Sequence, residues 1–236
     1  MSKFLRTFDG LKSNTIFCMW TGDNPMSAQR IQALWSIYNN TGCPVALINQ
    51  SNLQHWVHPD YPLHPAYPYL SATHKSDYLR VYFMHHYGGG YTDIKQTTVD
   101  WPVFFQRLRS SDAFALGYQE LPHGIPHVDG ALGDEIRAKH AELIGLCAFI
   151  FKKNSVLTNR WFNLTNTLLD SKFYFLIANP ASHPQDQFNL QLDNSTYSNY
   201  PLRWAELLGE LFHPLIYELR NHLLLDNINP RFYNYR

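Results

Sequence analysis

Short apolar runs alternate, in the first part of the chain, with segments whose apolar residues recur every three or four positions. Residues 14–20 (NTIFCMW) and 43–49 (CPVALIN) are apolar runs bounded by turn signals, which predicts two strands. Ser27 can cap a helix over residues 28–40. The apolar residues at helical spacing in that segment are Ile31, Leu34, Trp35 and Tyr38. This strand–helix–strand order favours a parallel sheet.

A proline-rich segment and a glycine run frame the next predicted helix. Residues 55–69 contain repeated prolines, which interrupt regular structure, so we expect an ordered surface loop there. Residues 71–87 predict a helix that ends at the three glycines of positions 88–90. Its apolar stripe consists of Leu79, Tyr82, Phe83 and His86. Residues 91–99 (YTDIKQTTV) then predict a strand edge.

The second half of the chain continues the alternation of strands and helices. Residues 113–119 and 143–151 predict two more strands, and residues 159–170 predict a helix. Residues 204–225 are amphipathic and predict a helical C-terminal tail. We therefore expect one α/β domain over residues 1–236, with a Rossmann-type mixed, mainly parallel sheet flanked by helices.

Composition narrows the function classes. The chain has 236 residues, 45% of them apolar, and no formal net charge, which argues against disorder and against nucleic acid as a partner. Its three cysteines form no CxxC pair, which favours a reducing compartment. The N-terminal residues contain no long apolar stretch, so we expect no signal peptide or membrane span and a cytoplasmic location. The amphipathic tail leaves peripheral membrane contact open.

A helix, a glycine run and an acidic strand end follow one another between His74 and Lys95 (HKSDYLRVYFMHHYGGGYTDIK). Asp77 and Arg80 are three positions apart and therefore share one helix face. The glycines permit close backbone approach or a sharp turn. Asp93 stands where a strand would end, the edge at which open α/β sheets bind ligands. Each feature alone has an ordinary structural reading, but their order together predicts a binding site.

The histidines do not add a metal site to this picture. His85 and His86 are adjacent and point in different directions on a helix. No predicted helix carries an HxxxH or HExxH pattern, so we do not expect a zinc enzyme.

The segment KSDYLRVYFMHHYGGGYTDIK resembles the donor-site signature of the sugar-binding-region glycosyltransferases that carry a DxD motif. The match is closer to the bacterial capsular polysaccharide synthesis protein family. Members of that family also resemble this chain in the MWTG segment that begins at Met19 and in a late YPLRWAELLGELFHP segment. The resemblance extends from about Phe17 to about Pro214, and its central motif is the specific part.

The resemblance implies a GT-A fold and a UDP- or GDP-sugar donor whose sugar passes to a glycan or lipid-linked glycan acceptor. The donor-binding part would span about residues 14–120, and the acceptor side and tail about residues 121–236. Asp77 and Arg80 would hold the sugar or ribose, Asp93 would hold the diphosphate through Mn or Mg, and Trp20 would stack on the base. Asp93, Asp77 and Arg80 are the expected catalytic residues. The full expected donor-binding set is Trp20, Asp77, Arg80, Gly89, Gly90, Tyr91, Asp93 and Lys95.

Lys95 departs from the DxD pattern, because it stands where the second aspartate is expected. An ammonium repels a cation and attracts phosphate. Asp93 would then bind a metal alone or with a distant ligand, for which the candidates are Asp186, Asp193 and His213. Alternatively, Lys95 and Arg80 neutralise the diphosphate themselves. The sequence favours metal binding slightly over this alternative.

The implied reaction retains the anomeric configuration by front-face attack. It needs no dedicated protein base, because the departing phosphate can accept the proton of the acceptor. An inverting enzyme needs a general base, and Glu206 and His213 are the late candidates for an acceptor-side or base role. The alternative function is a nucleotide-sugar or carbohydrate binding module that has lost turnover. A nucleotidyltransferase is disfavoured, because no Gly-rich N-terminal nucleotide loop occurs. Trp204, on the tail, is expected to pack in the core.

Overall fold

The computed structural model describes residues 7–233 and contains one six-stranded sheet within them. The strand order is β2-β1-β3-β5-β4-β6. The strands are β1 (Ile16–Trp20), β2 (Val45–Asn49), β3 (Gly89–Thr92), β4 (Ala115–Gln119), β5 (Ile144–Phe151) and β6 (Leu223–Leu225). β5 runs antiparallel to both of its neighbours, whereas the other pairings are parallel. The expected α/β fold with a mixed, mainly parallel sheet flanked by helices is confirmed.

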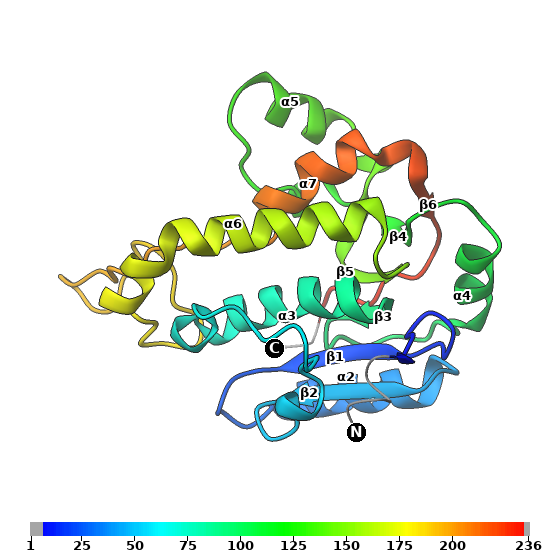
Figure 1. The fold of residues 1–236 in the computed structure, drawn as a ribbon, viewed down its shortest axis with the longest axis horizontal. Coiled ribbons are helices and arrows are strands. Elements are labelled where there is room, and N and C mark those ends of the chain that lie inside the picture. Colours follow the sequence, from blue (N-terminus) through cyan, green and yellow to red (C-terminus); the bar gives the residue numbers. More distant parts are fainter. Residues whose placement is uncertain (1–6, 234–236) are drawn as a thin grey trace.

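Helices cover both faces of this sheet (Figure 1). α3 (Ala72–His86), α6 (Val156–Ala178) and α7 (Gly209–Glu218) pack on one face, and α2 (Ala28–Asn40) and α4 (Pro102–Arg109) pack on the other. Another helix, α5 (Gly130–Ala138), lies against α7. The sequence analysis did not predict α4 or α5.

Alternation along the strands explains why the chain forms two hydrophobic clusters. Successive residues of a strand point to opposite faces. In β1, Phe17 joins the cluster under α3, whereas Ile16 joins the cluster under α2. In β5, Phe149 and Ile150 divide in the same way. The sheet is therefore buried on both sides, as the continuous apolar runs of its strands indicate.

The predicted burial face of α2 is wrong in part. Ala33 and Ile37 are its buried residues, whereas the side chains of Ile31, Trp35 and Tyr38 are exposed. Ala33 and Ile37 are four positions apart and so lie on one face, and the short alanine side chain lets the helix approach the sheet closely. Ile31, Trp35 and Tyr38 therefore face outward, whereas Leu34 is partly buried against the same cluster as Ala33.

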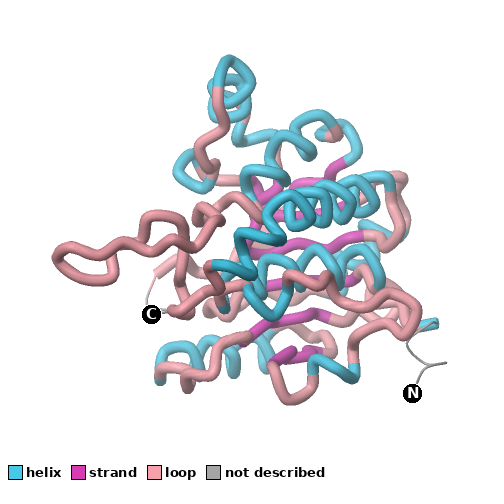
Figure 2. Tube along the Cα trace, turned by 60° about the vertical axis from the view of Figure 1, so that its left-hand side comes forward, coloured by secondary structure: helices cyan, strands magenta, loops and turns pink. Residues whose placement is uncertain are grey.

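Two element boundaries also differ from the expectation. β3 begins inside the glycine run, at Gly89, and ends at Thr92, so the residues after Asp93 form no strand. The end of the predicted helical tail is strand β6, because Leu223–Leu225 pair in parallel with β4 at the sheet edge. The segment of residues 179–208, between α6 and α7, includes a loop that projects from the body of the molecule (Figures 1 and 2), whereas its end, with Tyr200, Leu202 and Leu207, is buried in the core.

Candidate functional site

A cavity of about 870 Å³ opens at the edge of the sheet where the parallel strands end. Trp20 is the last residue of β1, and Asp93 follows directly after β3. β5 runs in the opposite direction, so its early residues Leu146 and Cys147 reach the same edge. α3 forms another wall. The cavity thus lies where open α/β sheets bind their ligands.

α3 presents two charged residues to this cavity. The side chain of Ser71 caps the helix by accepting a hydrogen bond from the backbone amide of His74. One turn further on, Asp77 and Arg80 lie on the same helix face and line the cavity. Both are almost fully buried, which is unusual for charged side chains and requires compensating partners.

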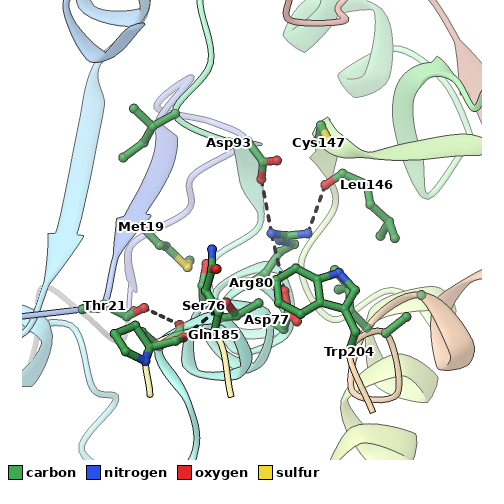
Figure 3. A pocket seen from close by; sticks show the side chains of 18 of the residues that line it. Met19, Thr21, Ser76, Asp77, Arg80, Asp93, Leu146, Cys147, Gln185 and Trp204 are labelled. Carbon is green, nitrogen blue, oxygen red and sulfur yellow. Dashed lines mark hydrogen bonds and ion pairs between the residues drawn. The ribbon is translucent and has the colours of Figure 1, made fainter. Parts of the chain in front are cut away.

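The Arg80 guanidinium bridges the helix to the ends of β3 and β5 (Figure 3). It donates to the Leu146 carbonyl oxygen at 3.1 Å and to the Tyr91 hydroxyl at 2.7 Å. It also lies 3.3 Å from Oδ1 of Asp93, and the Tyr91 hydroxyl donates to that same oxygen at 2.8 Å. These contacts fix the guanidinium plane between α3 and the sheet edge.

Lys95 approaches Asp93 from the other side. Its Nζ lies 2.8 Å from Oδ2 of Asp93 and 2.9 Å from Sγ of Cys147. The side chain is only 8% exposed, and its Nζ also lies 5.4 Å from the centre of the Phe232 ring. Two cations, Lys95 and Arg80, therefore flank the single carboxylate of Asp93.

The charged side chains around Asp93 and Lys95 determine the pKa values of these two residues. Burial by itself would raise the pKa of Asp93, but Lys95 and Arg80 outweigh it and lower the pKa below its ordinary value. Burial would lower the pKa of Lys95, but Asp93 outweighs it and raises the pKa. Both residues are therefore charged at neutral pH.

Asp77 differs from Asp93, because the positive charges near it offset the cost of its burial less completely. Oδ1 of Asp77 is 3.7 Å from the Arg80 guanidinium, which lies closer to Asp93. Burial, reinforced by the charge of Asp93, raises the pKa of Asp77 to about 7, although Arg80 opposes the shift. Asp77, at the wall of the cavity, therefore changes between its protonated and ionised forms near neutral pH.

The surroundings of Asp93 do not fit the divalent cation that the resemblance implies. Oδ1 of Asp93 is bound by Tyr91 and Arg80, and Oδ2 is bound by the Lys95 ammonium. A cation at either oxygen would stand beside a positive charge, and the cavity's other carboxylate, Asp77, is buried next to Arg80 with a raised pKa. Within residues 7–233, no group of three or more His, Cys, Asp or Glu side chains could hold a metal ion. The two distant aspartates named as ligand candidates, Asp186 and Asp193, are not among the residues that line the cavity.

The structure brings together most of the expected donor-binding residues. The members that line the cavity are Trp20, Asp77, Arg80, Tyr91, Asp93 and Lys95. The indole nitrogen of Trp20 donates to the Asn24 carbonyl oxygen at 2.8 Å, which orients the ring at the end of β1.

Gly89 and Gly90 lie elsewhere, among the packed strands. A Cβ on Gly89 would stand 2.8 Å from the Thr15 carbonyl oxygen, and one on Gly90 would stand 2.9 Å from the Trp101 ring. Gly89 also has a φ of +91°, which favours glycine. Their close backbone approach is therefore to the neighbouring strand and to α4, and neither glycine lines the cavity.

Glu206 and His213 are also outside the cavity lining. Glu206 accepts from the Arg203 backbone amide at 2.9 Å and pairs with Lys172 at 3.3 Å. His213 is fully buried, with Nδ1 3.0 Å from the Gly209 carbonyl oxygen and Nε2 3.2 Å from Oε2 of Glu120. Their contacts connect the C-terminal segments to the rest of the fold.

Several cavity residues were missed by the sequence analysis. Trp204 was expected in the core, but its side chain is 45% exposed and forms one wall of the cavity (Figure 3). Arg30 on α2 lines the cavity and donates to the Ile94 carbonyl oxygen at 2.6 Å. The start of the 179–208 loop contributes His183, Pro184 and Gln185. The one available signal for Trp204 was its position in the YPLRWAELLGELFHP segment, which shares in the resemblance.

Searches among known proteins add no further assignment: no protein-family model matches the chain, and no curated protein matches it. In residues 7–233, no helix has the length and apolar character that crossing a membrane requires.

Proposed function

We propose that the protein is a glycosyltransferase that moves a sugar from a nucleotide-diphosphate-sugar donor to a glycan or glycolipid acceptor. The observation that carries this proposal is the gathering of Trp20, the Asp77–Arg80 pair and the Asp93–Lys95 pair in one cavity at the carboxyl edge of the sheet. An aromatic ring, hydrogen-bonding carboxylates and fixed cations are the groups that a base, a sugar and a diphosphate require.

Each group has a defined role in the proposed reaction. Trp20 stacks on the base, and Asp77 binds hydroxyl groups of the sugar or ribose. Asp93 holds Arg80 and Lys95 in place beside the diphosphate. Negative charge develops on the diphosphate as the glycosidic bond breaks, and preorganised cations beside it lower the barrier. The acceptor hydroxyl attacks the face from which the phosphate departs, which retains the configuration, and the departing phosphate accepts the acceptor's proton, so no protein base is needed.

A donor screen followed by an activity assay tests this function. Thermal unfolding is measured with UDP-, GDP- and CDP-sugars, because a ligand that binds only the native state raises the unfolding temperature. The bound donor is then assayed for hydrolysis and transfer. Asp93→Ala should abolish transfer, whereas Asp112→Ala, at an exposed aspartate outside the cavity, should retain it. Near-normal turnover in Asp93→Ala would remove this site from consideration.

The second candidate is a nucleotide-sugar binding module without turnover. It is favoured by one observation: both carboxylate oxygens of Asp93 are already bound by neighbouring side chains. Donor binding without hydrolysis or transfer, across all acceptors tried, would select this alternative.

A lipid-linked acceptor and peripheral attachment to the cytoplasmic side of a membrane form the last part of the proposal. Tyr174 and Phe175, near the end of α6, and Phe188 in the following loop are exposed apolar residues. The same loop begins with residues that line the cavity. Sedimentation with lipid vesicles tests this attachment, and Phe175→Ser combined with Phe188→Ser should reduce the bound fraction.

A further inference from the structure

Lys95 is held in a fixed position by three separate parts of the chain. It follows β3 closely in sequence, and its Nζ binds Asp93 at 2.8 Å. Cys147, on β5, lies 2.9 Å from the same nitrogen, and Phe232, near the C-terminus, places its ring 5.4 Å away. A lysine on a solvated surface samples many rotamers, whereas this buried ammonium is confined beside Asp93.

The charge of this pair equals that of a metal-loaded acidic pair. Two aspartates with one divalent cation carry no net charge, and Asp93 with Lys95 also carries none. Lys95 therefore neutralises Asp93 as a bound cation would neutralise an acidic pair, with one positive charge in place of two, and it does so within the polypeptide.

We propose that the Lys95 ammonium takes the place of a divalent cation, so that the donor diphosphate is bound directly by side-chain cations of this chain. This inference rests on the proposed function and specifies how its site recognises the diphosphate. Arg80 is the second cation, because it lines the same cavity and lies 3.3 Å from the other oxygen of Asp93.

Arg80 also provides an independent indication of an anionic ligand. Its Nε is buried and has no hydrogen-bond partner in the part of the chain that the structure describes. An unpaired buried donor is costly, and most such groups in proteins are bound to an acceptor. A phosphate oxygen in the cavity is an acceptor of the kind that a guanidinium binds best.

Binding of nucleoside diphosphates with and without metal tests this inference. UDP, GDP and CDP are titrated into the full chain by calorimetry, once in excess EDTA and once in Mn²⁺. We expect the wild type to bind the best nucleotide at least as tightly in EDTA as in Mn²⁺, because no metal ion takes part in binding.

Two substitutions at Lys95 sharpen the test. Lys95→Met keeps the apolar stem and removes the charge, so we expect binding to weaken roughly tenfold or more in both conditions, as for the loss of a charge-assisted hydrogen bond. Lys95→Asp restores two carboxylates, so we expect binding that needs Mn²⁺ and a direct Mn²⁺ signal by calorimetry that the wild type lacks. Lys139→Met and Lys139→Asp, at a partly exposed lysine outside the cavity, are matched controls that should bind as the wild type does.

The outcomes separate this inference from the proposed function. Wild-type binding that requires Mn²⁺, or Lys95→Met binding as tight as the wild type, overturns the inference and leaves the function standing. No binding of any nucleotide by the wild type in either condition removes both. If Lys95→Asp does not fold, as judged by circular dichroism, the comparison of the wild type with Lys95→Met decides the question alone.

Discussion

Asp77 lies one helical turn before Arg80, and its Oδ1 atom is 3.7 Å from the Arg80 guanidinium. This distance is too long for a strong hydrogen bond, because close charge-assisted pairs lie at about 2.7–2.9 Å. The buried carboxyl of Asp77 is therefore compensated only in part, and burial raises its pKa to about 7. One side chain of the cavity thus titrates near neutral pH, while Asp93 stays ionised.

Asp77→Asn should stabilise the protein at neutral and alkaline pH. A carboxyl whose folded-state pKa lies above its unfolded value of about 3.9 favours folding at low pH and loses this contribution as the pH rises. The gain in the free energy of unfolding should grow from near zero at pH 4 to on the order of 2 kcal/mol above pH 7. Urea unfolding at several pH values measures it, with Asp112→Asn as the control. A gain that does not vary with pH would contradict this account.

Trp20→Ala should weaken nucleotide binding about tenfold, since stacking of a base on an aromatic ring contributes about 1–3 kcal/mol. Calorimetry with the best nucleotide from the donor screen measures the effect. Trp35→Ala is the matched control, because Trp35 is 62% exposed on α2 and lies outside the cavity lining. Equal affinity of the two variants would mean that the base does not stack on Trp20.

Gly89→Ala should destabilise the fold by about 3 kcal/mol, because its Cβ would meet the Thr15 carbonyl oxygen and its φ of +91° is unfavourable for alanine. Gly130→Ala, at a φ of +71° with no atom near its Cβ, should cost only about 1 kcal/mol. Chemical denaturation compares the two variants. Folded Gly89→Ala should bind nucleotide normally; a selective loss of binding would instead place Gly89 in the donor site.

His213→Ala should destabilise the protein by about 3 kcal/mol, because it leaves Oε2 of the buried Glu120 carboxylate without a partner, while Oε1 keeps the Leu121 backbone amide. His213→Gln keeps a donor for Glu120 and should cost less. Thermal unfolding gives the stabilities, and transfer assays below the unfolding temperature test the other role of this residue. Loss of transfer in folded His213→Gln would restore His213 as a candidate base.

The candidate site was predictable from the sequence where neighbouring residues form it. Asp77 and Arg80 share a helix face because they are three positions apart, and Asp93 follows a strand because the glycine run separates helix from strand. The same local patterns located the strand of residues 143–151 and the helix after Ser27. These features depend on spacings within one or two helical turns, that is, on residues that are close together in the sequence.

Contacts between distant residues were not predictable in this way. The burial face of α2 was wrong in part, because an apolar stripe does not state which side meets the sheet: Ala33 and Ile37 are buried there, whereas Ile31 is exposed. Trp204 was expected in the core but lines the cavity, for a related reason. Its segment lies in a loop whose path depends on the packing of the loop against α3.

The sequence by itself determined the order of the first five strands and of the helices α2, α3 and α6, and the presence of Asp77, Arg80, Asp93 and Lys95 around one glycine run. Only the tertiary structure decided that Lys95 turns back onto Asp93 and is held there by Cys147, which lies 52 residues away in the chain. Local periodicity restricts side chains within a turn or a strand. The partner of a buried charge, in contrast, depends on which strand ends meet at the edge of the sheet, and therefore on how the whole sheet is assembled.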